Sequence, residues 1–259
     1  MLDYDREAAH YDATRGGDAR AAAAAGAIED LLTRARPAPA PVAARVRIAD
    51  LACGTGIVTA RLAGPGRQVL GLDQSAGMAA VAAGRLPGRI GRADATRLPL
   101  ASGSVDVVTM VWLLHLLPAP AAVRAVAEAG RVLAPDGLLI TTVFKNDAPF
   151  SAETGDEAAA ILAPVRARFR SGPADALDRV ATAGGPHGLT LAAQTTFTGI
   201  GQGQSPRAWR EQLTGGDLTW AAAAGPDRVA TLNADLAGLP EQDRPRPDPV
   251  YQLAAFRKH

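Results

Sequence analysis

The sequence predicts an α/β protein, with a parallel sheet covered by helices on both faces. The first observation is an alternation of short apolar strand patterns with helical patterns from about residue 46 to residue 144. The second is a pair of apolar runs, Ile48–Gly56 (IADLACGTG) and Leu70–Asp73 (LGLD), in which an acidic residue closes the strand pattern. Because strands joined through helices run parallel and cross over right-handedly, this alternation defines the fold class.

The elements follow in order along the chain. Residues 3–33 read as helical, and the alternating proline and alanine of Arg36–Pro41 end that helix and form a linker. Pro135–Gly137 marks the turn into the fifth strand. Strands are predicted at 46–51, 68–72, 89–93, 105–111 and 138–144, and helices at 57–63, 75–85 and 120–133.

Beyond Phe144 the pattern is looser. A helix at about 154–170 is expected to return to the sheet, and Leu189–Thr198 reads as a sixth strand. Residues 205–239 read as helical, with tryptophan, proline and glycine residues interrupting the pattern. Val250–Arg257 reads as a last strand.

The acidic strand ends and the small-residue turn between them predict a nucleoside site. Glycines at 54 and 56 let the backbone approach a ligand, and Asp73 is placed to accept ribose hydroxyl groups. A dinucleotide site needs a small third residue, whereas the matching positions here hold β-branched Ile57 and Thr59. Asp50 would repel a pyrophosphate and suits an ammonium group, so these features together favour S-adenosylmethionine.

Six motifs follow one another along the chain: Tyr11–Arg15, Asp50–Gly56, Gly71–Met78, Ala93–Val108, Trp112–Pro118 and Arg131–Ile140. In this order they resemble the class I S-adenosylmethionine-dependent methyltransferases, in the branch that includes the ubiquinone/menaquinone-type enzymes. The resemblance covers roughly the first 145 residues, and Ala52 replaces the first glycine of the family's loop. A methyl group there is tolerable if the backbone φ is negative.

The resemblance implies the complete architecture. It implies a Rossmann-like, seven-stranded, mostly parallel sheet in the order 3-2-1-4-5-7-6, with an antiparallel last strand. Residues 1–40 would form an N-terminal helical lid and linker, and residues 41–259 the catalytic domain. A helical cap near the C-terminus is expected at about 200–245.

The resemblance also implies roles for cofactor-binding residues. Ala52 and Gly54 would meet the methionine moiety, and Arg15 would lie near its carboxylate. Gln74 and Met78 would line the adenine pocket, with ordinary core packing as the alternative for Met78. Asp94 would meet the adenine amino group, with a helix N-cap or turn aspartate as its alternative, and the Ala95 N–H would reach a ring nitrogen. The full expected set is Tyr11, Arg15, Asp50, Ala52, Gly54, Gly56, Asp73, Gln74, Met78, Asp94, Ala95 and Val111.

The methyl acceptor is expected beside the end of the fourth strand, where Trp112 and His115 follow. His115 is the candidate general base, and a packing role at the pocket wall is its alternative. Phe197, Trp209 and Trp220 are candidate walls of an apolar acceptor pocket, with simple anchoring of the cap as the alternative.

Composition excludes several classes of partner. The net charge of +1 gives no electrostatic case for nucleic acid or membrane binding. The single cysteine, Cys53, cannot form a disulfide within these residues and fits a reducing compartment, so a cytoplasmic location is expected. The histidines lack metal-ligand spacing, which predicts no metal.

Composition rich in alanine, arginine, glycine and proline suggests a bacterial source, and the protein is expected to be a monomer or homodimer.

The predicted function is therefore methyl transfer from S-adenosylmethionine to a small-molecule acceptor through an oxygen, nitrogen or carbon nucleophile, with S-adenosylhomocysteine as product. Two alternatives stay open. One is a non-catalytic S-adenosylmethionine-binding partner subunit, and the other, which Thr59 and Asp50 disfavour, is an NAD-type oxidoreductase.

Overall fold

The computed structural model describes residues 3–35, 45–151, 154–216 and 218–259. The chain divides into two compact units. The sheet unit consists of Met1–Lys145, Ala174–Phe197 and Tyr251–His259, and the helical unit consists of Asn146–Pro173 and Thr198–Val250. The linker predicted at Arg36–Pro41 lies outside the described residues.

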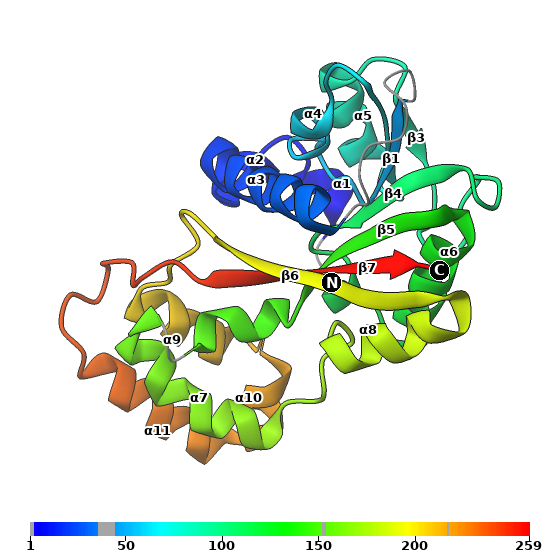
Figure 1. Ribbon diagram of the computed structural model, residues 1–259. Coiled ribbons are helices and arrows are strands. Elements are labelled where there is room, and N and C mark those ends of the chain that lie inside the picture. Colours follow the sequence, from blue (N-terminus) through cyan, green and yellow to red (C-terminus); the bar gives the residue numbers. More distant parts are fainter. Residues whose placement is uncertain (1–2, 36–44, 152–153, 217) are drawn as a thin grey trace. The chain divides into compact units, whose positions relative to one another are not determined.

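The sheet unit contains seven strands in the order β3-β2-β1-β4-β5-β7-β6, which confirms the predicted order (Figure 1). Neighbours among the first five strands are parallel, and β7 runs antiparallel to β5. The order reverses between β1 and β4, where open α/β sheets form a ligand crevice at the carboxyl ends of the strands. The strands are β1 (Val46–Leu51), β2 (Arg67–Asp73), β3 (Ile90–Arg92), β4 (Val105–Met110), β5 (Leu133–Val143), β6 (Leu189–Thr198) and β7 (Val250–Lys258).

The fifth strand begins earlier than predicted. Leu133 already pairs with Val105, and Leu138 pairs with Val107, so Pro135–Gly137 form an irregularity inside the strand rather than a turn before it. Asp136, at φ 62°, adopts the left-handed conformation that lets the extra residues loop out.

Helices cover both faces of the sheet. Figure 1 shows α3 (Gly17–Ala35), α4 (Thr59–Leu62) and α5 (Ala76–Arg85) on one side, and α6 (Ala119–Val132) and α8 (Leu177–Gly184) on the other. The buried residues of α6 recur at helical spacing, which is why this helix lies against the sheet. They are Ala122, Ala125, Val126, Ala129, Gly130 and Val132.

The N-terminal helical segment is divided, although the sequence predicted one helix over 3–33. It forms α1 (Tyr4–Glu7), α2 (Tyr11–Thr14) and α3, and the turn from α2 into α3 contains Gly16, at φ 80°, and the first residue of α3, Gly17, at φ 51°. A left-handed pair of glycines cannot continue a right-handed helix, so the chain changes direction there.

The helical unit has a hydrophobic core of its own. It contains α7 (Glu157–Phe169), α9 (Pro206–Gly215), α10 (Thr219–Ala224) and α11 (Pro226–Ala237). The sequence assigned the cap to 200–245 alone and returned the helix at 154–170 to the sheet. Instead, α7 contributes Ala158 and Leu162 to the core that also contains Trp209, Leu213, Trp220, Ala221, Leu232 and Leu236.

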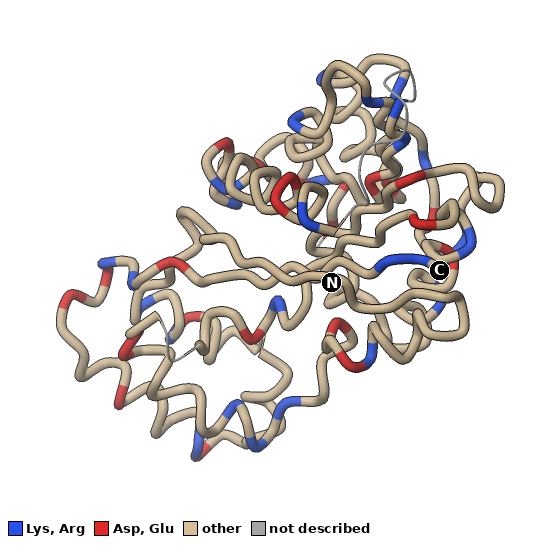
Figure 2. Tube along the Cα trace, in the orientation of Figure 1, with Lys and Arg blue, Asp and Glu red and all other residues tan. Residues whose placement is uncertain are grey.

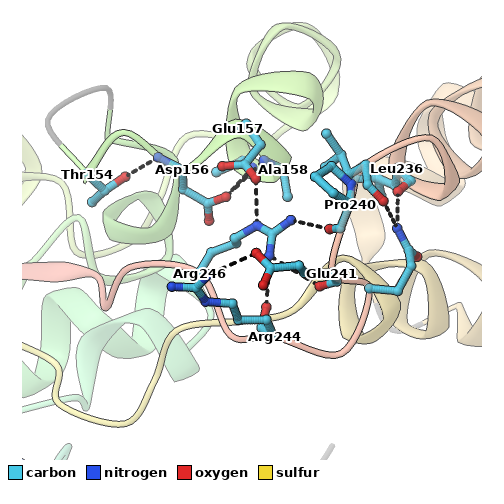
Figure 3. A network of polar contacts seen from close by, with 12 residues as sticks. Thr154, Asp156, Glu157, Ala158, Leu236, Pro240, Glu241, Arg244 and Arg246 are labelled. Atoms are coloured by element: carbon cyan, nitrogen blue, oxygen red, sulfur yellow. Dashed lines mark hydrogen bonds and ion pairs between the residues drawn. The ribbon is translucent and has the colours of Figure 1, made fainter.

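A buried arginine joins the two chain segments of the helical unit (Figure 3). The Arg246 guanidinium donates to the carbonyl oxygens of Pro240 at 2.8 Å and Arg244 at 3.1 Å. It also forms an ion pair, at 2.7 Å, with Glu157 at the start of α7. These contacts hold the chain after α11 against α7.

Candidate active site

A cavity of about 630 Å³ lies at the carboxyl ends of the parallel strands. The segments that line it come from the sheet unit: the N-terminal helices and the loops after β1, β2, β3 and β4. This volume falls in the range of small-molecule sites. Of the predicted cofactor-binding residues, those lining the cavity are Tyr11, Arg15, Asp50, Ala52, Gly54, Asp73, Gln74, Met78, Asp94, Ala95 and Val111.

The loop after β1 is left-handed at three positions. Gly54 and Gly56 have φ values of 56° and 73°. Ala52 has φ 54°, so the expectation of a negative φ for its methyl group is wrong. For an L-residue this conformation costs about 1–2 kcal/mol of free energy. The path of the loop to the cavity imposes this conformation on Ala52.

The two glycines of this loop have different surroundings. A Cβ added at Gly54 would meet nothing within 4 Å, which leaves open space beside this cavity-lining backbone. A Cβ at Gly56 would lie 2.9 Å from the Cβ of Ala82 on α5. Gly56 is absent from the cavity lining, so we assign it to close packing of the loop on α5 rather than to ligand contact.

Asp50 lies at the end of β1 and is buried, with 4% of its surface exposed. Its two carboxylate oxygens accept hydrogen bonds from the hydroxyl groups of Thr59, at 2.5 Å, and Thr109, at 2.6 Å. Burial raises the pKa of Asp50 to about 6, and the two hydroxyl donors oppose that rise. Thr59, which disfavoured a dinucleotide fingerprint, therefore has a direct role in holding this carboxylate.

Asp73, at the end of β2, is a carboxylate of the cavity wall that two backbone N–H groups hold in place. One oxygen accepts the Gly54 N–H at 2.8 Å, and the other accepts the Ser75 N–H at 2.8 Å. Burial raises the pKa of Asp73, and its backbone hydrogen bonds lower it. Each carboxylate oxygen has a further lone pair, so a fixed carboxylate of this kind can accept two hydroxyl groups of a ligand.

The residues predicted to contact adenine lie on the cavity wall together with Asp73. Gln74, Ala95 and the buried Met78 all line the cavity. Asp94 also lines it, and one of its carboxylate oxygens accepts the Thr96 N–H at 2.8 Å, so this side chain caps its own turn as well.

The N-terminal segment covers the cavity through two acidic contacts that the sequence did not reveal. Asp5 accepts the Ser75 hydroxyl and, at 2.8 Å, the Gly77 N–H at the start of α5. Asp12 accepts the Thr55 hydroxyl at 2.6 Å and pairs with Arg85 at 2.6 Å. Tyr4, Asp5, Asp12 and Arg20 line the cavity beside the predicted Tyr11 and Arg15.

The approach of α1 to α5 depends on a glycine, which gives the first prediction. A Cβ at Gly77 would lie 2.7 Å from the Asp5 carbonyl oxygen, whereas a Cβ at Gly84 on the same helix would meet nothing within 4 Å. We expect Gly77→Ala to release α1 and to speed proteolytic cleavage of the N-terminal segment at least about ten-fold. Gly84→Ala is the matched control, and equal cleavage rates in both variants would contradict this docking role.

Trp112 forms the aromatic part of the wall at the end of β4. Its backbone adopts φ 59°, and its N–H donates to the Thr142 hydroxyl at 2.8 Å. Its ring packs edge-on against Phe197 at a centroid distance of 5.9 Å and against Tyr251 at 6.1 Å. Phe197 thus supports Trp112 from behind, because Phe197 is not among the cavity-lining residues.

Trp209 and Trp220 do not line the cavity. They are 3% and 6% exposed and belong to the core of the helical unit, where Trp209 lies 5.3 Å from the ring of Phe150. They pack within the helical unit itself, whereas the alternative that the sequence left open had them anchor the cap to the body.

His115 lies in a short 3-10 helix, η1 (Leu114–Leu116), and does not line the cavity. Its Nδ1 is buried with no hydrogen-bond partner among the described residues. Burial, with a smaller contribution from Lys145, lowers the pKa of His115 to about 3. A base of that strength outside the cavity is unsuited to deprotonating an acceptor, and we do not retain His115 as the general base.

The second prediction concerns His115→Asn. We expect the methyl-transfer rate to change less than about ten-fold for any acceptor, well below the 10²–10⁴-fold of a positioned base. The wild type should lose stability as pH falls from 6.5 toward 3, because unfolding lets this histidine take up a proton. Unfolding free energies across that range should fall less steeply in the variant. A hundred-fold rate loss in the folded variant would restore the base assignment.

Two further properties bear on the predicted partners. Among the described residues, no group of three or more His, Cys, Asp or Glu side chains could hold a metal ion. Within the same residues, no helix has both the length and the apolar character needed to cross a membrane. Figure 2 shows basic and acidic residues interspersed along the chain.

Comparison with known proteins shows which family this chain resembles in sequence. The methyltransferase-domain family Methyltransf_11 matches residues 49–141, from β1 to β5. A demethylmenaquinone methyltransferase from Mycolicibacterium paratuberculosis is 35% identical over 188 residues, which cover 70% of this chain and 77% of the relative. The same-named protein of Beutenbergia cavernae is 40% identical over 131 residues, 49% of this chain. The match spans about half of that relative's length, 53%.

Solved structures agree on the fold. The [4+2]-cyclase SpnF has a TM-score of 0.55 at 22% identity, covering 98% of this chain and 93% of its own. A putative methyltransferase from Bacillus halodurans has a TM-score of 0.54 at 17% identity, covering 90% of this chain and 99% of its own. Identities this low establish the fold alone, and the first of these proteins is named for a different reaction.

Proposed function

Because this chain belongs to the class I S-adenosylmethionine-dependent methyltransferases, we propose that it transfers a methyl group from S-adenosylmethionine to a small-molecule acceptor. The observation that carries the proposal is the buried Asp73 carboxylate, held by two backbone N–H groups at the end of β2. A fixed acceptor at this strand end suits the two ribose hydroxyl groups of the adenosyl moiety.

The rest of the wall also fits this cofactor. Met78 and Ala95 offer apolar contact for a flat base, and Asp94 offers a carboxylate for an amino group. Arg15 lines the cavity from the N-terminal segment, where it would pair with the methionine carboxylate. Asp50 and Asp73 add two carboxyl groups to the wall, which suits a ligand that carries positive charge.

When bound, S-adenosylmethionine supplies a methyl group made electrophilic by its sulfonium centre. The chain's own residues position and enclose the reactants. Val111 and Trp112 place an apolar wall at the end of β4, and Asp5 and Asp12 fasten the N-terminal segment that excludes water. We assign no general base, so alignment and desolvation carry the rate, as they do when two reactants are held in attack geometry.

Of the predicted acceptor-binding residues, Trp112 alone is retained as a wall residue. The named relatives are demethylmenaquinone methyltransferases, and an acceptor with a ring system would suit the face of an indole. A cytoplasmic location, a bacterial source and a monomeric or homodimeric state belong to the same proposal and rest on composition and the single Cys53.

The experiment that tests the function has two stages. Calorimetry first measures S-adenosylhomocysteine binding, and labelled S-adenosylmethionine is then turned over against a panel of small metabolites, with any methylated product identified. Binding with turnover supports the enzyme. Binding without turnover on any acceptor favours the non-catalytic partner, and binding of NAD instead of S-adenosylhomocysteine would overturn the family assignment of the site.

A further inference from the structure

A buried arginine forms part of the cavity wall, and none of the sequence motifs included it. Arg20 lies on α3, lines the cavity and is only 8% exposed. A guanidinium cannot lose its proton in a protein, so this position keeps a permanent positive charge away from bulk water. Such a position is costly, and burial lowers the pKa of Arg20.

Aromatic groups surround the Arg20 guanidinium. It lies 3.9 Å from the centroid of the Trp112 ring, and the side chains of Tyr11 and Tyr251 raise its pKa against the effect of burial. Trp112 is the wall residue at the end of β4, beside which the transferred methyl group is expected. Arg20 therefore stands on the acceptor side of the cavity, against a flat apolar surface.

Two further cations lie near Arg20. Arg15 lines the cavity from the end of α2, and Lys145 follows β5. Burial and the charges of Arg20 and Arg15 lower the pKa of Lys145 to about 8, against the opposing charge of Asp175. Arg15 and Arg20 both line the cavity, so an anion bound beside them would interact favourably with two positive charges.

We propose that the methyl acceptor carries an anionic group, such as a carboxylate, on a flat apolar body, and that Arg20 binds that group beside Trp112. This inference rests on the proposed methyltransferase function and names the substrate class of the same site. The cofactor's own carboxylate does not account for Arg20, because Arg15 is the cation assigned to it. A planar guanidinium can take a carboxylate in two parallel hydrogen bonds.

The test uses 2-naphthoate and its neutral analogue 2-naphthamide as probes of the protein saturated with S-adenosylhomocysteine. Calorimetry should show naphthoate binding at least about ten-fold more tightly than naphthamide. Arg20→Gln should reduce that preference to within about three-fold, and Arg20→Lys should keep part of it. The matched control is Arg34→Gln, an exposed arginine of the same helix, which should keep the full preference.

Stability and cofactor binding separate this role from a structural one. Arg20→Gln removes a buried charge, so the variant should unfold at the wild-type temperature or above it, and its S-adenosylhomocysteine affinity should stay within about three-fold of the wild type's. Naphthoate binding no tighter than naphthamide, a preference that survives in Arg20→Gln, or a ten-fold loss of S-adenosylhomocysteine affinity in that variant would each overturn the proposal. Failure of the wild type to bind S-adenosylhomocysteine would instead refute the proposed function.

Discussion

Replacing Asp73 with alanine is expected to weaken S-adenosylhomocysteine binding by about 1.5–3 kcal/mol, or roughly 10- to 150-fold in affinity. The carboxylate is buried at the end of β2, and its orientation is fixed by the N–H groups of Gly54 and Ser75. A ligand hydroxyl that loses such a charged partner is left without its strongest hydrogen bond. The same substitution frees the Gly54 N–H, so the loop after β1 loses an anchor together with the ligand.

Calorimetry on Asp73→Ala and on a control, Asp94→Ala, measures this effect. Asp94 is exposed and already caps the Thr96 N–H, so its loss should weaken binding less than that of Asp73. Thermal unfolding must show that both variants are folded. Equal affinity of the wild type and Asp73→Ala would contradict the assignment of the ribose to the end of β2. It would also contradict the ligand orientation inferred from that assignment.

Local patterns predicted the sheet well. The predicted bounds of the first and sixth strands coincide with β1 and β6, because turn residues and apolar runs mark those ends directly. The order of the strands came from the resemblance to the family. That Asp50 and Asp73 lie near each other follows from the parallel sheet itself, because the carboxyl ends of parallel strands meet at one edge.

What the sequence could not predict depends on contacts between distant segments. The core of the helical unit combines α7 with helices that follow β6, and no local pattern of 154–170 identifies that partner. The left-handed φ of Ala52 is likewise imposed by the loop's path and not by alanine's own preference.

The sequence pattern of α3 contains a signal for Arg20. It shares one helix face with Ala24, Ile28 and Leu31, all buried, so it is a charged residue at an apolar position of α3. A cation on the buried face of a helix needs a compensating neighbour, and such a residue is a candidate for ligand contact. The alanine-rich sequence around it reads as ordinary helix and conceals that periodicity.

The largest loss of stability is expected from a substitution at Gly203, where two backbone segments of the helical unit approach each other closely. A Cβ at Gly203 would lie 1.9 Å from the carbonyl oxygen of Arg246. The segments are held at this distance by Asp248, whose carboxylate accepts the N–H groups of Gly203 and Gln202 at 2.8 Å. Arg246 is itself fixed by Glu157 and by the carbonyl groups after α11 (Figure 3), so neither backbone can move aside without breaking these bonds.

Gly203→Ala is therefore expected to destabilise the protein by about 3 kcal/mol or more, because the overlap involves backbone atoms rather than the end of a flexible side chain. For a chain of this size the melting temperature should fall by about 6–12 °C, and amide exchange should accelerate first in α7 and α11. Gly238→Ala is the control within the same unit, since its Cβ would meet its nearest atom at an ordinary 3.4 Å, and it should change stability by less than about 0.5 kcal/mol. Similar melting temperatures for the two variants would mean that the segments beside Arg246 separate freely and that the ion pair with Glu157 does not fix them.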